Sequence, residues 1–297
     1  MRLAVTGKNG QVVSALQALA SAELEILTLG RPELDLAQPE TVLKTLREVK
    51  PDVVVSAAAY TAVDKAESER DIAFAINRDG ARAVAQAASE LGIPVIHLST
   101  DYVFDGSKPT PYVESDPTGP ASIYGRSKLE GEQAVSEATA NYAILRTAWV
   151  YSEYGNNFVK TMLRLSESRD EINVVADQFG CPTSANDIAT AIITIARKLD
   201  ADSSVRLRGV FHLSGTGETN WANFAKQIFA FSAENGGKSI IVNDITTAQY
   251  PTPARRPANS RLDCSKLEEV YGIRLPSWQT STRAVVTALA QTKKETP

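Results

Sequence analysis

Tyr124 and Lys128 stand four positions apart within residues 122–128, and side chains of these types at this spacing could carry out proton transfer. If the segment is helical, the ammonium of Lys128 lies beside the phenol of Tyr124, because residues four apart share a helix face. A free tyrosine titrates near about 10, and a fixed neighbouring cation favours the phenolate. We therefore predict that Lys128 lowers the pKa of Tyr124 towards working pH. The same spacing also arises by chance, so its meaning depends on the elements around it.

A glycine turn near the start of the chain, residues 6–13 (TGKNGQVV), indicates where a nucleotide cofactor would bind. The turn follows the first expected strand and opens the first expected helix, where backbone N–H groups point at a pyrophosphate. Val13 stands at the position of the third glycine of a dinucleotide fingerprint, so we expect this helix to pack slightly further from the strand. The alternative is a simple tight turn between strand and helix. The expected cofactor contacts in this turn are Gly7, Asn9, Gly10, Gln11 and Val12.

The second expected strand ends at Arg31, with no acidic residue directly after it to accept a ribose 2′-hydroxyl. Arg31 could instead face a 2′-phosphate, which favours NADPH over NADH. A solvated loop arginine is the alternative, since Glu33 and Asp35 are close in sequence. Small residues after the third strand would either let a dinucleotide approach the backbone or form a core turn. The further expected cofactor contacts are Asp35, Leu36, Ala58, Ala59 and Thr61.

Short β-branched runs alternate with longer helical patterns over residues 1–150, which predicts an α/β fold with a doubly wound parallel sheet of the Rossmann type that binds NAD(P). The pattern loosens over residues 151–297 and indicates a smaller α/β substrate lobe, with strands near 171–176 and 209–214 that return to the sheet. Expected strands of the first part cover 3–6, 25–29, 52–56, 94–98 and 143–147. Expected helices cover 11–20, 39–50, 72–91, 123–139, 157–168, 186–199, 221–231 and 280–291.

The composition excludes several classes of protein. The 297 residues are 43% hydrophobic with a net charge of −4, which allows a full core and argues against a broad basic surface for nucleic acid or anionic membrane. Cys181 and Cys264 lack a CxxC spacing, and His97 and His212 have no clustered ligands in sequence, so we expect no metal. The first apolar run is too short for a signal peptide and no later run reaches membrane-spanning length, so we expect a cytoplasmic protein.

The fourth expected strand runs into residues 99–104 (STDYVF), which places the hydroxyl of Thr100 at the carboxyl end of the sheet. Together with the glycine turn and the Tyr124 and Lys128 spacing, this pattern resembles the extended short-chain dehydrogenase/reductase family. The resemblance spans nearly the whole chain and extends to those members that reduce dTDP-4-keto-6-deoxyhexoses. The blocks that carry it are 99–104, 124–129 (YGRSKL), 146–151 (RTAWVY), 177–183 (DQFGCPT) and 250–257 (YPTPARRP).

The resemblance implies hydride transfer from NADPH, or NADH, to C4 of dTDP-4-dehydro-L-rhamnose, giving dTDP-L-rhamnose for cell-surface polysaccharide. Tyr124 would donate the proton to the developing alkoxide, Lys128 would bind the nicotinamide ribose, and Thr100 would orient and polarise the carbonyl. Leu98 is implied as one more cofactor contact, along with Tyr124 and Lys128 themselves. The implied contacts of the dTDP-sugar are Thr100, Asp101, Trp149, Asn157, Gln178, Arg255 and Arg256, of which the arginine pair suits the two phosphates.

Two alternatives share this fold. The first is a nucleotide-sugar epimerase or dehydratase; dehydratases usually carry an acidic pair beside the catalytic threonine, whereas here only Asp101 follows Thr100 directly. The second is a regulatory subunit like that of methionine adenosyltransferase, which needs no proton donor and so gives no reason for an intact Tyr124. Some relatives dimerise through acidic residues and Mg²⁺. Ala15 stands where such an acid would be sought, so we expect any homodimer to form without a metal.

Overall fold

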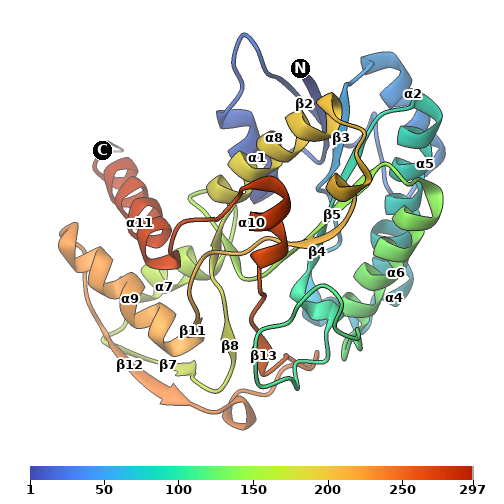
Figure 1. The fold of residues 1–297 in the computed structure, drawn as a ribbon. Helices are drawn as coiled ribbons and strands as arrows, with labels where there is room; N and C mark the ends of the chain where they lie inside the picture. Colours follow the sequence, from blue (N-terminus) through green and yellow to red (C-terminus); the bar gives the residue numbers. More distant parts are fainter. Residues whose placement is uncertain (296–297) are drawn as a thin grey trace.

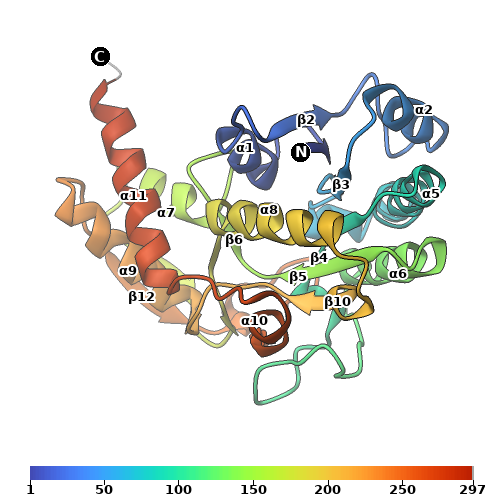
Figure 2. The same ribbon diagram turned by 45° about the horizontal axis from the view of Figure 1, so that its top comes forward.

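A parallel sheet of six strands with helices on both faces dominates the computed structural model, which describes residues 1–295 (Figure 1, Figure 2). The strand order is β10-β5-β4-β3-β1-β2, and every neighbouring pair is parallel. The order reverses at β1, which lies between β2 and β3, and ligands of such sheets bind at that reversal. The predicted doubly wound sheet is confirmed. Its strands are β1 (Arg2–Thr6), β2 (Glu25–Leu29), β3 (Val53–Ser56), β4 (Val95–Thr100), β5 (Tyr142–Thr147) and β10 (Gly209–His212).

The strands are apolar on both faces because helices cover both. Leu3 and Val5 pack in one hydrophobic cluster, and Ala4 between them packs in the other, so successive side chains of β1 point to opposite faces. All three side chains are fully buried. The helices that contribute to the first cluster are α1 (Gln11–Ala18), α8 (Ala185–Ala201) and α10 (Ser265–Tyr271), and those of the second are α2 (Glu40–Val49), α5 (Ala81–Leu91) and α6 (Ile123–Ala138).

The helix expected over residues 72–91 is interrupted. A π-helical turn, η1 (Ala75–Gly80), precedes α5 and follows the short helices α3 (Val63–Ala66) and α4 (Arg70–Phe74). The turn places the amide of Asn77 between two segments: it accepts from Tyr60 N at 2.8 Å and donates to Ser127 Oγ at 2.9 Å. A Cβ at Gly131 would lie 2.1 Å from the carbonyl oxygen of Asn77, so α6 approaches this turn as closely as only glycine allows.

The second lobe surrounds an aromatic core that includes Phe224 and Trp278. The strand expected near 171–176 is β7 (Glu171–Val175), and the expectation that it returns to the large sheet is wrong, because it pairs with β12 (Ile241–Ile245). Alternate side chains of β7 are exposed and buried, as in a strand that covers a core with one face. The strand expected near 209–214 is β10, which lies at the sheet edge beside β5. A domain boundary at residue 150 stays a prediction.

Figure 2 shows helices α9 and α11 of this lobe on the opposite side of the molecule from α2 and α5. Besides the pair of β7 and β12, the smaller elements form one sheet of three short strands and one of two, and the chain also contains three short 3₁₀ turns among its described residues. The remaining elements are β6 (Val150–Tyr151), α7 (Phe158–Ser166), β8 (Phe179–Gly180), β9 (Thr183–Ser184), β11 (Thr219–Asn220), α9 (Trp221–Glu234), β13 (Asn259–Ser260), α11 (Trp278–Glu295), η2 (Asp101–Val103), η3 (Val205–Leu207) and η4 (Thr247–Gln249).

A buried ion pair joins α6 to β5. Arg146 donates to both carboxylate oxygens of Glu132, at 2.9 and 2.7 Å, and both side chains are only 5% exposed. Removing one partner of such a pair leaves an uncompensated charge, so we expect Glu132→Gln to lower the free energy of unfolding by about 3 kcal/mol in urea denaturation. Glu137→Gln, on the exposed side of the same helix, is the control and should change it by less than about 0.5 kcal/mol. Equal stability of the two variants would contradict this account.

Candidate active site

The start of α6 brings Tyr124 and Lys128 to the carboxyl end of β4. Ser122 is the N-cap of the helix, and its Oγ accepts from Gly125 N at 3.1 Å, which fixes Tyr124 in the first turn and Lys128 one turn later. A Cβ at Gly125 would lie 2.2 Å from the carbonyl oxygen of Tyr102, so this glycine allows α6 to press against the turn that follows Thr100. The sequence prediction that the pair lies on one helix is confirmed.

Thr100 ends β4 and is 6% exposed. Its Oγ1 donates to Asp101 Oδ1 at 2.9 Å and accepts from Tyr102 N at 3.2 Å. Because a hydroxyl has one proton, Thr100 can donate to a substrate carbonyl only when its hydrogen bond to Asp101 is exchanged. This makes the protonation of Asp101 important to the site.

Asp101 is 3% exposed, and its Oδ2 has no hydrogen-bond partner among residues 1–295. Desolvation raises the pKa of this carboxyl to about 6, although the hydrogen bond from Thr100 opposes the rise. A carboxyl that titrates near pH 6 can be neutral or charged under working conditions. The neutral form would release the hydroxyl of Thr100 for a substrate oxygen.

The pKa of Tyr124 is raised, not lowered, which contradicts the expectation from its spacing to Lys128. Burial of the phenol is the main cause, with Asp101 and Tyr102 adding to it and hydrogen bonding to Thr100 opposing it. The ammonium of Lys128 donates to the Leu98 carbonyl at 2.6 Å instead of to the phenol. Burial therefore holds Tyr124 in its neutral form, which is the form that can donate a proton.

Lys128 is 3% exposed, and burial lowers the pKa of its ammonium to about 8, with Glu132 acting in the opposite direction. Its Nζ lies 3.5 Å from Nε2 of His97, and His97 Nδ1 lies 3.1 Å from Ser56 Oγ. Burial and the nearby ammonium lower the pKa of His97 well below its usual value, so this imidazole stays neutral. The ammonium therefore faces a neutral ring and a carbonyl at the end of β4.

The glycine turn has the geometry of an anion site. Gly7 has φ +103°, a conformation that side chains rarely adopt, and its N–H donates to the Leu29 carbonyl at 2.6 Å. Gly10 is the N-cap of α1 and provides no side-chain cap, so the first N–H groups of α1, including those of Gln11 and Val12, stay open to a ligand. Asn9 is exposed at the tip of this turn.

A second cation lies beside Arg31, and the sequence analysis missed it. Lys8 Nζ donates to the Arg31 carbonyl at 3.0 Å and to Glu33 Oε2 at 2.7 Å. Arg31 itself is exposed. The sequence did contain a sign of this contact. Lys8 lies in the glycine turn after β1, and because β1 and β2 are neighbouring parallel strands, the residues that follow them lie close together. Lys8 and Arg31 therefore lie close together after the ends of β1 and β2, and their contact with a ribose phosphate stays a prediction.

The other expected cofactor contacts flank this turn. Asp35 Oδ1 accepts from Ala37 N at 3.0 Å, which closes a local turn, and Leu36 is buried in the second hydrophobic cluster. Thr6 Oγ1 accepts from the N–H of Ala58 at 3.0 Å and so ties the end of β3 to the end of β1. Their contacts to a dinucleotide, and those of Ala59 and Thr61, which continue the same segment, stay predictions.

Trp149 is held in an unusual position at the boundary between the lobes. Its φ is +49°, and its ring stacks on Trp221 with the centroids 3.5 Å apart. A Cβ at Gly180 would lie 2.4 Å from the Trp149 ring, so the indole is pressed against this glycine from the other side. Such strain persists only where the surroundings impose it, and it is common at ligand sites. Trp221, which stacks on Trp149, was not predicted as part of the site, because no motif in the sequence distinguishes it.

Asn157 has its side chain occupied by structural contacts. It caps α7 by accepting from Lys160 N at 3.2 Å, and its Nδ2 donates to Gln11 Oε1 at 2.9 Å and to the Ser152 carbonyl at 2.8 Å. These bonds tie the glycine turn to the second lobe. The structure therefore uses Asn157 to join the lobes, and its contact with the sugar stays a prediction.

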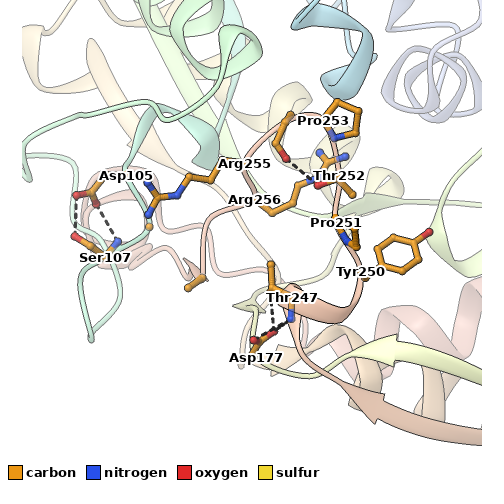
Figure 3. Close-up of a pocket in the computed structure, with 13 residues that line it drawn as sticks. Asp105, Ser107, Asp177, Thr247, Tyr250, Pro251, Thr252, Pro253, Arg255 and Arg256 are labelled. Atoms are coloured by element: carbon orange, nitrogen blue, oxygen red, sulfur yellow. Dashed lines mark hydrogen bonds between the residues drawn. The ribbon is translucent and has the colours of Figure 1, made fainter.

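A cavity of about 600 Å³ opens beside the site (Figure 3). We call residues 250–257 the substrate loop. Its residues 250–256 form much of the cavity wall, and Asp177 and Thr247 contribute at one side. Gln178 Nε2 donates to Thr247 Oγ1 at 3.0 Å, which ties Gln178 to the same side. The residues that line the cavity do not include Thr100, Tyr124 or Lys128. The reacting groups therefore lie outside the cavity wall, and Arg256, which lines the cavity, connects it to the turn after Thr100 through its hydrogen bond to Tyr102.

The two arginines of the substrate loop differ. Arg255 is exposed and makes no hydrogen bond or ion pair with residues 1–295, and Figure 3 shows the two side chains leaving the loop in different directions. Arg256 is less free, because its Nη2 donates to Asp64 Oδ2 at 2.6 Å. A phosphate contact is therefore open to Arg255 as it stands, whereas Arg256 already has a partner.

The candidates for metal binding are scattered. In the part of the chain that the structure describes, no three His, Cys, Asp or Glu side chains gather into a metal site. Burial lowers the pKa of His212 to about 3, and Ala15 is buried in the first hydrophobic cluster.

Within residues 1–295, no helix is both long and apolar enough to span a bilayer.

The fold and the site together define the class of protein to which this chain belongs. A doubly wound sheet, a glycine turn at its strand reversal, and a threonine, tyrosine and lysine at the end of β4 are the features of the extended short-chain dehydrogenases/reductases. The comparison with protein families then gives the particular member. A family model described as the RmlD substrate binding domain matches residues 1–291, and the chain belongs to this family.

Known relatives agree with this assignment. The chain is 65% identical to a dTDP-4-dehydrorhamnose reductase of Sinorhizobium fredii, over 97% of this chain and 98% of that protein. The crystal structure of a dTDP-4-dehydrorhamnose reductase from Clostridium acetobutylicum superposes with a TM-score of 0.90 at 38% identity, over 97% of this chain and 99% of that one. A dTDP-4-dehydrorhamnose reductase from Bacillus anthracis in complex with NADP gives 0.89 at 38% identity, over 96% and 98%. The resemblance predicted from the sequence blocks is confirmed.

Proposed function

We propose that this protein reduces the C4 keto group of dTDP-4-dehydro-L-rhamnose with NADPH and yields dTDP-L-rhamnose for cell-surface polysaccharide. The observation that carries the proposal is the group formed by the buried Thr100 and Lys128 and the partly buried Tyr124 at the end of β4, two strands from β1, where the strand order reverses. The names of the relatives support the substrate, and the NADP complex of one of them supports the cofactor. A cytoplasmic location and a homodimer stay predictions.

The residues divide the work of the reduction. NADPH, when bound, supplies the hydride that adds to C4. Thr100 orients the carbonyl, and Tyr124 gives its O–H proton to the oxygen of C4 as that oxygen becomes an alkoxide. The phenol is then reprotonated from water. Lys128 keeps a positive charge in this dry site, where it favours the negative charge that develops on oxygen.

The direct test is a spectrophotometric assay of purified protein with dTDP-4-dehydro-L-rhamnose and NADPH. We expect NADPH absorbance to fall in step with formation of dTDP-L-rhamnose, identified by chromatography. A nucleotide sugar without a keto group at C4, such as dTDP-glucose, should give no NADPH consumption. An epimerase would convert a nucleotide sugar without net consumption of NADPH, and a regulatory subunit would do neither, so either outcome would overturn the proposal.

The choice between the two cofactors should depend on Arg31. Arg31 is exposed after the end of β2, and its backbone carbonyl accepts from Lys8 Nζ, so both residues lie near the expected site of a 2′-phosphate. We expect Arg31→Asp to lower the ratio of kcat/KM with NADPH to that with NADH by about tenfold or more, because a carboxylate repels the phosphate and accepts from a ribose hydroxyl. Arg47→Asp on the exposed side of α2 is the control. An unchanged ratio would show that Arg31 does not read the 2′-phosphate.

A further inference from the structure

One carboxylate ties the cofactor half of the molecule to the substrate loop. Asp64 lies in α3, shortly after residues 57–61 at the end of β3. Its Oδ2 accepts from Arg256 Nη2 at 2.6 Å, and its Oδ1 accepts from the backbone N–H of Ala254 at 3.2 Å. Asp64 thus holds both the backbone and a side chain of a loop that is about 190 residues further along the chain.

The same guanidinium continues the connection to the reacting groups. Arg256 Nη1 donates to the Tyr102 hydroxyl at 3.1 Å. The ring of Tyr102 meets the ring of Tyr124 edge to face, with the centroids 5.5 Å apart. Asp64, Arg256 and Tyr102 therefore form a continuous bridge from α3 to the proton donor. We call these three residues the Asp64 bridge.

The Asp64 bridge also sets the shape of the cavity. Residues 250–256 line it, and beyond them the chain is fixed by close packing, since a Cβ at Gly106 would lie 2.4 Å from Pro257 Cβ. Asn259 N donates to the Gly106 carbonyl at 3.1 Å and anchors that end. The middle of the loop is held by its two hydrogen bonds to Asp64, from Ala254 N and from Arg256 Nη2. Removing that carboxylate would free the part of the loop that carries Arg255.

We propose that Asp64 is a positioning residue for the nucleotide sugar: it fixes the substrate loop so that Arg255 and the unused N–H groups of Arg256 meet the diphosphate. A guanidinium has five N–H donors, and the bonds to Asp64 and Tyr102 use two of them. The carboxylate orients the guanidinium, and the exposed Arg255 supplies an unpaired charge. The inference rests on the proposed function for the identity of the ligand.

The test is Asp64→Asn, which keeps the volume and removes the charge. We expect the KM for dTDP-4-dehydro-L-rhamnose and the Kd of dTDP in calorimetry to rise about three- to tenfold, a range that allows for the partial exposure of the pair. We expect kcat and the Kd of NADPH to stay within about twofold. Asp64→Glu, which restores a carboxylate, should recover part of the affinity. Asp71→Asn, an exposed position on α4, is the matched control and should leave every value unchanged.

The possible outcomes separate the two proposals. Wild-type protein that binds no dTDP would overturn the proposed function. Wild-type protein that binds dTDP with the same affinity as Asp64→Asn would overturn only the role of Asp64. A fall in kcat and melting temperature together with the rise in KM, and no recovery in Asp64→Glu, would assign Asp64 a merely structural role and would also overturn the inference. A rise in KM and Kd with kcat and melting temperature retained supports it.

Discussion

Replacing Tyr124 with phenylalanine is expected to lower kcat by about 10²- to 10⁴-fold, the range that a positioned general acid contributes. The variant keeps the aromatic ring that meets Tyr102 edge to face, so the packing at the start of α6 should survive. Only the proton donor is lost. Stopped-flow and steady-state measurements of NADPH oxidation give kcat, and fluorescence titration of NADPH should give a Kd within about twofold of wild type.

Tyr142→Phe is the matched control for this prediction. Tyr142 begins β5, at the opposite end of the parallel strands from Thr100, and its loss of one hydroxyl should leave kcat unchanged. If Tyr124→Phe turned over at the wild-type rate, Tyr124 could not be the proton donor. Water would then have to reach the C4 oxygen, and the burial of the phenol would have no catalytic purpose.

The raised pKa of Tyr124 is consistent with the direction of the reaction. A reduction needs a protonated donor at the start, and desolvation holds the phenol in that form. A lowered pKa, as the spacing to Lys128 had suggested, would have favoured the phenolate, which suits the reverse reaction better. The proton is transferred when an alkoxide forms, because an alkoxide is a stronger base than a phenolate.

The large sheet and most helices were predictable from the sequence because they follow local rules. Alternating apolar runs predicted β1 to β5, and the helical pattern over residues 123–139 predicted α6. The π turn at Asn77 was not predictable, since it arises from the close approach of Gly131 on another helix. The same holds for β7, whose partner β12 lies about 70 residues later.

The chemistry of the site was less predictable than its position. Residue types and spacing placed Thr100, Tyr124 and Lys128 together, because strand ends and helix starts meet at one edge of the sheet. The pKa of Tyr124 depends instead on burial and, to a smaller degree, on the charges of Asp101 and Tyr102, which only the three-dimensional structure reveals. Contacts between distant segments, such as Lys8 with Glu33 or Asp64 with Arg256, also leave no pattern in a single sequence.

The surroundings of Lys128 make its charge sensitive to pH. Burial lowers the pKa of the ammonium to about 8, so its charged fraction falls as the pH rises through that value. Its neighbours are the Leu98 carbonyl and the neutral ring of His97, with Glu132 one turn further along α6. Asp101 and Tyr102 stand in η2, directly after β4. Of these, Asp101 titrates lower, near pH 6, so a change above pH 8 reports on Lys128.

Lys128→Met should therefore lower kcat/KM by about 10²- to 10³-fold, the effect of removing one preorganised group that stabilises charge in a transition state. In wild type, kcat/KM should fall about tenfold per pH unit above about pH 8, because only the ammonium form is active. The methionine variant should lose that dependence, since the titrating group is gone. Lys44→Met, exposed on α2, is the control and should keep both rate and pH profile. A wild-type profile that stays flat to pH 10 would show that the charge on Lys128 takes no part in the reduction.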